Sequence, residues 1–307
     1  MTDYKKKNQQ GIALIQVLLI SAVLSVLALY LTSTAKDQVK VAQWSIDKAQ
    51  ALVNINSGEA QLLFSLLTEK KQPFNQNKHN LDSNNDINIP LNQQWNFFNS
   101  PFVINDNVSV SIQDQAGLLS LNFPDQERFK KFIRAQGFTR IESNVIIDNL
   151  LDWQDLDNIP RLNGFEGNES NSNRLRNGAI PDVHDILFIN AIPESLYPLI
   201  IANSTMFRIG SFNPTAAPYS LLSALTDEQK AQQIIAWRNA GQLTKQKFTQ
   251  LTGIAESDDT FFYPSSYLSI NLQSKVGEAM AHKSIVVHIT PYVSAKNQPI
   301  NILSNRG

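Results

Sequence analysis

The chain of 307 residues contains no cysteine. That absence excludes disulfide bonds, thiolate metal sites and a cysteine nucleophile, although it does not assign a compartment. An excess of charge of either sign is also missing, because 26 basic and 27 acidic side chains leave a formal net charge of −1. No global basic field therefore points to nucleic acid or to an anionic lipid surface.

Signatures of catalysis are missing as well. The sequence has no Gly-x-Ser-x-Gly elbow, no phosphate-binding loop and no His-Glu-x-x-His pair. Acidic pairs occur, but any chain with 27 acidic residues contains them. Histidine is scarce, and no pair has the short spacing of a zinc site; the histidines are His79, His184, His282 and His288. We therefore expect a protein that is not an enzyme.

The N-terminus carries the strongest signal. Three lysines, Lys5 to Lys7, precede an apolar run from Ile12 to Leu31 that contains no charge, proline or glycine. About 20 such residues span the roughly 30 Å of bilayer hydrocarbon as a helix. The lysines predict a cytoplasmic N-terminus and an exported remainder. A secretory signal peptide would need a small-residue cleavage site after a shorter apolar run, whereas Gly11 lies before the run.

Gly11, followed by Ile-Ala-Leu-Ile-Gln-Val-Leu-Leu-Ile, resembles the leader of type IV prepilins. The resemblance implies that a prepilin peptidase cuts between Gly11 and Ile12 and methylates the new N-terminus. Gln16 then takes the fifth mature position, where ordinary pilins carry a glutamate that neutralises a neighbour's terminal amine. The GspK-type minor pseudopilins of type II secretion lack that glutamate, so the departure narrows the resemblance to them. A plain signal anchor is the alternative interpretation of the same segment.

The helical pattern continues beyond the apolar run. Between Lys36 and Leu67 there is no proline, and Gly58 is the only glycine. One helix from Ile12 to about Leu67, on the order of 80 Å long, is therefore predicted. A stripe of mainly apolar or small residues, with the polar Asn56 among them, recurs there at spacings of three and four; its members are Val39, Ala42, Ile46, Ala49, Val53, Asn56, Ala60, Leu63 and Leu67. We interpret the second half of this stripe as core packing on a sheet, and the stripe as a whole as a contact with filament partners.

Strand-like segments flank a helical middle. Residues 107–113 alternate with period two, residues 114–117 supply a turn, and residues 118–122 are interpreted as a hairpin partner. Segments 267–273 and 284–292 are again strand-like. The helices expected between them cover 126–136, 142–152, 181–189, 193–201, 218–225, 227–240 and 245–251. Strands, then helices, then strands predict a helical domain inserted in a sheet.

The predicted fold class is α+β, a type IV pilin-like fold with a long N-terminal helix packed on an antiparallel sheet and a large inserted all-α domain. The expected divisions are a leader (1–11), the transmembrane and pilin helix (12–70), a first part of the β-domain (71–124), the inserted domain (125–260) and a C-terminal part of the β-domain (261–307). This order resembles the GspK type, as do four short motifs at 114–122, 151–161, 182–188 and 212–218.

The resemblance implies a role and a location. The role is a minor pseudopilin that caps the tip of the periplasmic pseudopilus and helps to start its assembly for the export of folded proteins. The partners implied are other minor pseudopilins in a heterotrimeric tip complex, the major pseudopilin, the prepilin peptidase and the inner-membrane assembly platform. The location is the inner membrane of a Gram-negative bacterium, crossed once, with the bulk of the chain in the periplasm.

A rival function comes from residues 212–254, which also resemble a helix-hairpin-helix module of membrane-anchored DNA receptors. Such modules present glycine amides and basic side chains to phosphate. Here residues 225–229 replace the glycine-bearing hairpin, and Asp227 and Glu228 would face phosphate. We therefore expect no nucleic-acid partner.

A cluster of acids is the candidate metal site. Asp152, Asp155 and Asp157 lie in one loop, and Glu166 and Glu169 follow. Clustered carboxylates are how a hard cation such as Ca²⁺ is held, although the spacing is not that of an EF-hand. The alternative is a solvated acidic loop. The GspK resemblance also implies calcium binding in loops of the inserted domain.

Overall fold

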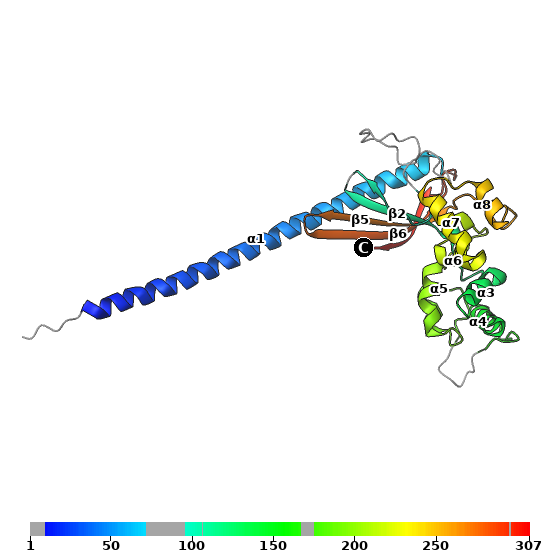
Figure 1. Cartoon of the computed structure of the whole chain (residues 1–307), viewed down its shortest axis with the longest axis horizontal. Coiled ribbons are helices and arrows are strands. Elements are labelled where there is room, and N and C mark those ends of the chain that lie inside the picture. Colours follow the sequence, from blue (N-terminus) through cyan, green and yellow to red (C-terminus); the bar gives the residue numbers. More distant parts are fainter. Residues whose placement is uncertain (1–9, 72–95, 106, 167–174, 295) are drawn as a thin grey trace, which may run out of the picture.

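A computed structural model describes residues 10–71, 96–105, 107–166, 175–294 and 296–307. Helix α1 (Gln10–Thr68) extends far beyond the rest of the chain, as Figure 1 shows. Its apolar segment is exposed throughout residues 13–31. The single long helix fits a single-pass membrane anchor. Lys5 to Lys7 lie outside the described residues.

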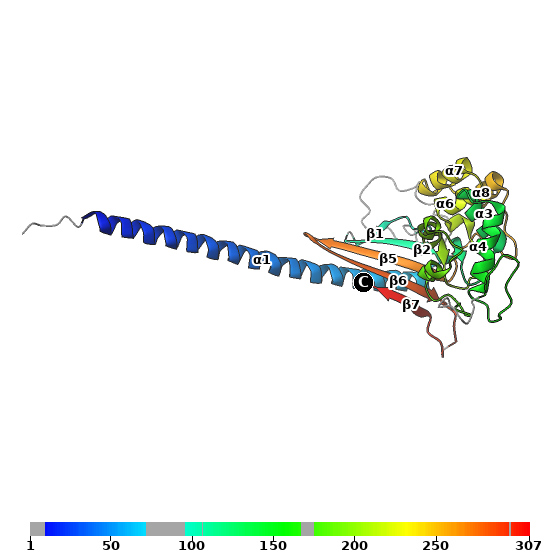
Figure 2. The same ribbon diagram turned by 90° about the horizontal axis from the view of Figure 1, so that it is seen from below.

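The C-terminal half of α1 packs on one antiparallel sheet of five strands, whose order is β1-β2-β5-β6-β7 (Figure 2). The strands are β1 (Phe102–Ile104), β2 (Val108–Asp114), β5 (Tyr267–Val276), β6 (Ala279–Ile289) and β7 (Ile300–Arg306). Ala51, Ile55 and Leu62 of the helix are buried against the inward side chains of the strands. Glu59 and Lys283 join α1 to β6 by an ion pair of 2.5 Å.

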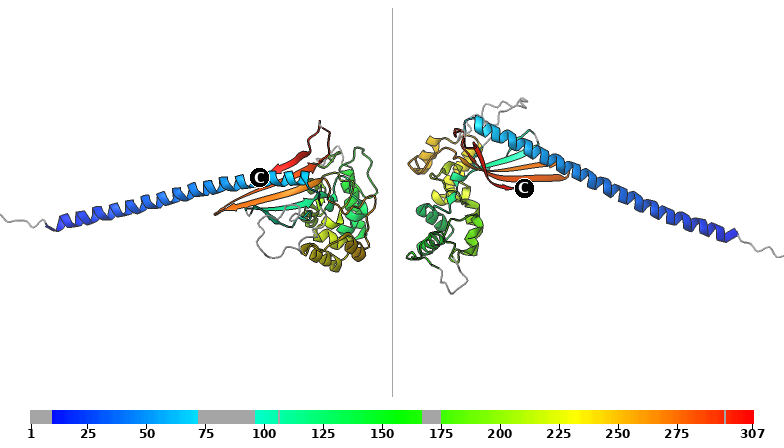
Figure 3. Two further views of the ribbon diagram at one scale, coloured as in Figure 1. Left: turned by 90° about the horizontal axis from the view of Figure 1, so that it is seen from above. Right: turned by 180° about the vertical axis from the view of Figure 1, so that it is seen from behind.

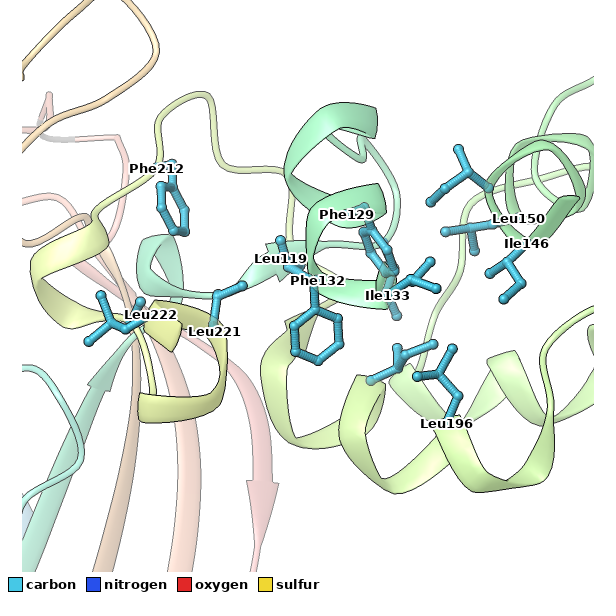
Figure 4. Packing of buried hydrophobic residues seen from close by; sticks show 14 of the residues in the cluster. Leu119, Phe129, Phe132, Ile133, Ile146, Leu150, Leu196, Phe212, Leu221 and Leu222 are labelled. Atoms are coloured by element: carbon cyan, nitrogen blue, oxygen red, sulfur yellow. The ribbon is translucent and has the colours of Figure 1, made fainter. Parts of the chain in front are cut away.

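A helical domain separates β2 from β5, although these two strands are hydrogen-bonded neighbours. The helices of this domain are α3 (Gln126–Ala135), α4 (Arg140–Asp152), α5 (Tyr197–Asn203), α6 (Tyr219–Leu225), α7 (Glu228–Asn239) and α8 (Lys245–Thr252). Phe129, Phe132 and Leu221 belong to its own buried core, shown in Figure 4. The predicted α+β fold with an inserted helical domain is confirmed.

Capping residues set where these helices begin and end. Thr139 and Glu142 form a reciprocal capping box at the start of α4, and Asp125 and Thr244 cap α3 and α8. Each cap satisfies backbone amides that have no partner within the helix. Gly253 follows the last turn of α8 at a φ of 75°, a left-handed conformation that favours glycine.

The hairpin predicted for residues 118–122 is wrong. Strand β3 (Leu119–Ser120) pairs in parallel with β4 (Ser204–Thr205) and not with β2. A 3-10 turn over Gln115–Gly117 directs the chain into the helical domain, where Leu119 and Leu121 are buried. Burial in that core outweighs the local hairpin pattern, because the hydrophobic gain is larger than that of one short strand pair.

Other differences are smaller. The helix predicted for residues 181–189 is a 3-10 helix over Val183–Phe188. Strands β1 and β7 were not predicted. Strand β1 has three residues, too few to show a period, and β7 contains two asparagines that are uncommon in strands.

The predicted core stripe on the second half of α1 is also wrong in part. The side chains that face the sheet are Ala51, Ile55, Leu62 and Leu66, whereas Val53, Asn56 and Ala60 are exposed; Leu63 and Leu67 are partly buried. Val53 follows Ala51 by two residues, which is about 200° around a helix, so the predicted stripe lies opposite the core. A spacing of three and four occurs on both faces, and only the sheet distinguishes them.

Candidate functional site

The candidate site lies where α4 ends and the following loop folds back along it. Asn163 Nδ2 donates to Asp148 Oδ2 at 2.7 Å, and Asn149 Nδ2 donates to the Asn163 carbonyl at 3.0 Å. The backbone N–H of Arg161 donates to Asp152 Oδ2 at 3.1 Å. Polar side chains on the last turns of α4 therefore hold a loop that has no helix or strand of its own.

Three carboxylates meet inside this fold. Asp152, Asp155 and Glu166 each offer one oxygen within 4.8 Å of the others. Asp152 is fully buried. Arg161 lies between two of them, because its Nη1 donates to Asp152 Oδ1 and to Asp155 Oδ2. One guanidinium thus faces three acids.

Two oxygens of this group are unsatisfied. In the described part of the chain, Asp155 Oδ1 and Glu166 Oε1 are buried and have no hydrogen-bond partner. Burial raises the pKa of Glu166, and the charges of Asp155 and then Asp152 raise it further. Buried acceptors without partners are costly, and a hard cation with oxygen ligands removes that cost. The donor set therefore fits Ca²⁺.

Gly164 makes the close packing possible. A Cβ at this position would collide with Asp152 Oδ2. Asp152 cannot swing aside readily, since both of its oxygens accept hydrogen bonds from Arg161. A side chain at position 164 would therefore disturb the carboxylate group, the name used from here on for the cluster of Asp152, Asp155 and Glu166.

The structure brings together Asp152, Asp155 and Glu166 of the predicted ligands. Asp157 is not in the group: its Oδ1 accepts from the Ile159 N–H at 2.9 Å and closes an exposed turn. Glu169 lies outside the described residues. Sequence reasoning missed Arg161 and Gly164 as parts of the site. The only signal for Arg161 in the sequence was its position as a basic residue among closely spaced acids.

The predicted interface residues are all on the uncovered surface of α1. They are Gln16, Val39, Ala42, Ile46, Ala49 and Val53. The proposed cleavage position, Gly11 and Ile12, falls in the first turn of α1.

The junction of α6 and α7 carries an acid where a DNA-binding hairpin would present amides. Asp227 Oδ1 accepts from the Lys230 N–H at 2.8 Å as the N-cap of α7. Its other oxygen lies 2.9 Å from Lys230 Nζ. The carboxylate satisfies the helix terminus that a phosphate would need, so the DNA-binding interpretation is not favoured.

The fold defines the class: a type IV pilin-like fold with a helical domain inserted between neighbouring strands. No protein-family model matches the chain, and a search of curated proteins finds no match. Among solved structures, the chain is similar to one in the GspK-GspI-GspJ complex of the enterotoxigenic Escherichia coli type 2 secretion system. The TM-score is 0.51 at 15% identity, over 89% of this chain and 98% of that one. The likeness covers most of this chain and shows a shared fold.

Proposed function

We propose that this protein is a minor pseudopilin of the GspK type that serves a type II secretion system. The observation that carries the proposal is the helical domain inserted between β2 and β5 behind a long apolar helix. A solved structure with a similar fold is one chain of a GspK-GspI-GspJ complex. The role is one of assembly and not of catalysis.

The protein is proposed to cap the tip of the pseudopilus. Gln16 is a neutral amide, so it supplies no carboxylate for a neighbour's terminal amine in the apolar filament core. The helical domain, roughly 135 residues, lies at the opposite end from the start of α1 (Figure 3). Repeated at every filament step it would collide with its neighbours, whereas one copy at the end meets no such clash.

The membrane helix sets the proposed location and processing. A prepilin peptidase cuts between Gly11 and Ile12, and the new N-terminus is methylated. The N-terminus is cytoplasmic and the folded domains are periplasmic, as the preceding lysines indicate. The exposed stripe from Val39 to Val53 then contacts two smaller pseudopilins, while the major pseudopilin and the assembly platform complete the filament.

The carboxylate group is proposed to bind Ca²⁺ through Asp152, Asp155 and Glu166. The support is the pair of buried oxygens without partners. The ion would hold the loop against α4 and play no chemical part.

Deletion of the gene tests the proposal. We expect export of secreted proteins to stop, and to return with the natural chain but not with a Gly11→Val chain that resists cleavage. Mass spectrometry should show a methylated N-terminus at Ile12. Normal export from the deletion strain would contradict the proposed function. Uniform labelling of the protein along isolated pseudopili would contradict the tip position.

A further inference from the structure

The loop from Leu156 to Phe165, called here the apolar loop, leaves four large apolar side chains in solvent. Leu156 is 85% exposed and Leu162 is 97% exposed. Ile159 and Phe165 are 75% and 46% exposed. Single exposed apolar residues are ordinary, but four within ten residues are an uncommon concentration, of the kind found at contact surfaces between proteins.

The apolar loop is firmly held although its apolar side chains are not buried. Asn163 donates its N–H to Asp148 Oδ2 at 3.2 Å as well as its side-chain amide. Gly164 N–H donates to the Arg161 carbonyl at 3.0 Å, and Arg161 is bound to Asp152. A partner would therefore meet a preorganised surface, which lowers the entropic cost of binding.

The segment that follows the apolar loop in sequence supplies no apolar side chain that could cover it. Residues 167–174 read Gly-Asn-Glu-Ser-Asn-Ser-Asn-Arg and contain no apolar side chain. The membrane that holds α1 is also excluded, because the helical domain and the N-terminal half of α1 lie at opposite ends in every view (Figures 1 and 3).

Charge narrows the choice of partner. Between 152 and 166 the chain carries four carboxylates, and Arg161 is the single basic residue. With a divalent cation bound, the net charge of this segment would still be negative. An anionic lipid surface and the same loop of a second copy would both be repelled. Basic groups around an apolar groove would complement this loop.

We propose that the apolar loop docks onto a separate protein, into an apolar groove edged by lysine or arginine side chains. Leu162 enters the groove, and the exposed carboxylate of Asp157 meets the basic edge. The proposal rests on the proposed function only for the place in the cell where the loop meets its partner.

The absence of cysteine permits a direct test in the full chain. A Leu162→Cys chain and, as matched control, a Lys131→Cys chain place one thiol each on exposed positions of the helical domain. A hydrophilic maleimide labels both in secreting cells and in the purified chain held in a lipid nanodisc. Occupancy of nine in ten should slow labelling of the Leu162→Cys thiol about tenfold in cells, with no change for the control.

A second measurement identifies the molecule that covers the apolar loop. A thiol-linked photocrosslinker at Leu162→Cys should give a protein adduct whose contact peptide contains Lys or Arg, and Phe165→Ser in the same chain should reduce its yield. An Ile159→Cys chain repeats the measurement at a second position. Any of four results would overturn the proposal. They are equal labelling rates in cells and nanodiscs, adducts with lipid alone, adducts with a second copy, and flotation of the nanodisc-held chain with phosphatidylglycerol vesicles.

Failure of the two proposals can be told apart. If gene deletion stops export while the Leu162→Cys thiol reacts equally fast in cells and nanodiscs, only the docking surface is wrong. If deletion leaves export intact, the pseudopilin function is wrong, and protection of the thiol still reports on the docking surface.

Discussion

Asn213 Nδ2 donates a hydrogen bond of 2.8 Å to Asp114 Oδ2, across 99 positions of sequence. Asp114 ends β2, where the chain leaves the sheet, and Asn213 lies deep in the helical domain. The same carboxylate accepts from Ser265 Oγ at 2.6 Å and from the Ser265 N–H at 3.2 Å, just before β5 begins. Both crossings between the sheet and the helical domain are thus tied to one buried acid.

Further buried contacts converge on this joint. Lys71, just beyond α1, donates to the Ser265 carbonyl at 3.0 Å. Burial lowers the pKa of Lys71, and the charge of Asp114 acts against that shift. Arg238 is buried and donates to the carbonyls of Ala217 at 2.7 Å and Pro214 at 3.0 Å. The segment resembling a family motif at 212–218 therefore has a structural role: it fixes the helical domain on the sheet.

We expect Asp114→Asn to lower the free energy of unfolding by about 2–4 kcal/mol. The amide supplies one acceptor oxygen where the carboxylate has two, and its NH₂ faces either the donors of Ser265 or the donor of Asn213, according to its orientation. Denaturant unfolding of the purified chain measures the change. Asp258→Asn, at an exposed position, is the control and should stay within about 0.5 kcal/mol of the natural chain. Equal stability of the two variants would contradict the role of the joint.

Calcium should raise the melting temperature of the full chain, compared with the chain in chelator. A ligand that binds only the folded state adds about 2.7 kcal/mol at a hundred times its dissociation constant. Asp155→Ala and Glu166→Gln should abolish the shift, because the first removes an unsatisfied ligand oxygen and the second removes the negative charge of a ligand. Thermal unfolding followed by circular dichroism measures it.

Two further variants distinguish the effect of bound calcium from that of the Arg161 guanidinium. Asp157→Asn is the matched control and should keep the full calcium shift, since Asp157 lies outside the carboxylate group. Arg161→Gln should enlarge the shift, because removal of the guanidinium leaves Asp152 and Asp155 without their counter-charge. Identical melting curves for the natural chain in calcium and in chelator would leave Arg161 as the resident cation.

The exposed stripe of α1 should carry the contact with smaller pseudopilins. Ile46→Arg is expected to weaken a one-to-one-to-one complex of the three proteins at least tenfold, about 1.4 kcal/mol. The fold should be unaffected, because Ile46 is 63% exposed. Ser45→Arg is the control, since it is also exposed but points about 100° away. Native mass spectrometry that finds both variants in the complex equally would exclude this face.

A pH effect is expected at the contact between β7 and the helical domain. Arg306 Nη2 donates to Asp182 Oδ2 at 2.8 Å. Hydrogen bonds from the His184 backbone and side chain, together with Arg306, lower the pKa of Asp182 from 3.8 to about 2. A carboxyl with a depressed pKa in the folded state contributes stability above its unfolded pKa and loses it on acidification. The loss should therefore occur between about pH 4 and pH 2.

The size of this effect is limited by solvent. Asp182 is more than a third exposed, so screening reduces its contribution to below about 1 kcal/mol. Unfolding of Asp182→Asn should show a shallower acid limb than that of the natural chain. An unchanged limb would mean that the cluster contributes nothing to stability.

Sequence by itself determined the long helix, the succession of a strand-bearing segment, a helical segment and a second strand-bearing segment, and the fold class. These follow from local properties: the uninterrupted apolar run after Gly11 and the period-two alternation at 107–113 are both visible in the sequence of one helix or one strand. It also proposed one candidate group of five acids, of which the structure brings Asp152, Asp155 and Glu166 together; the other two are Asp157 and Glu169.

Only the tertiary structure decided which face of α1 packs on the sheet, where Leu119 pairs, and that Asp157 turns away from the other acids. Each of these depends on partners distant in sequence. Ala51 or Val53 faces the core according to where the sheet lies, and Asp114 meets Asn213 only after the helical domain has folded between them. Local patterns offer alternatives of nearly equal energy, and long-range burial and hydrogen bonding select among them.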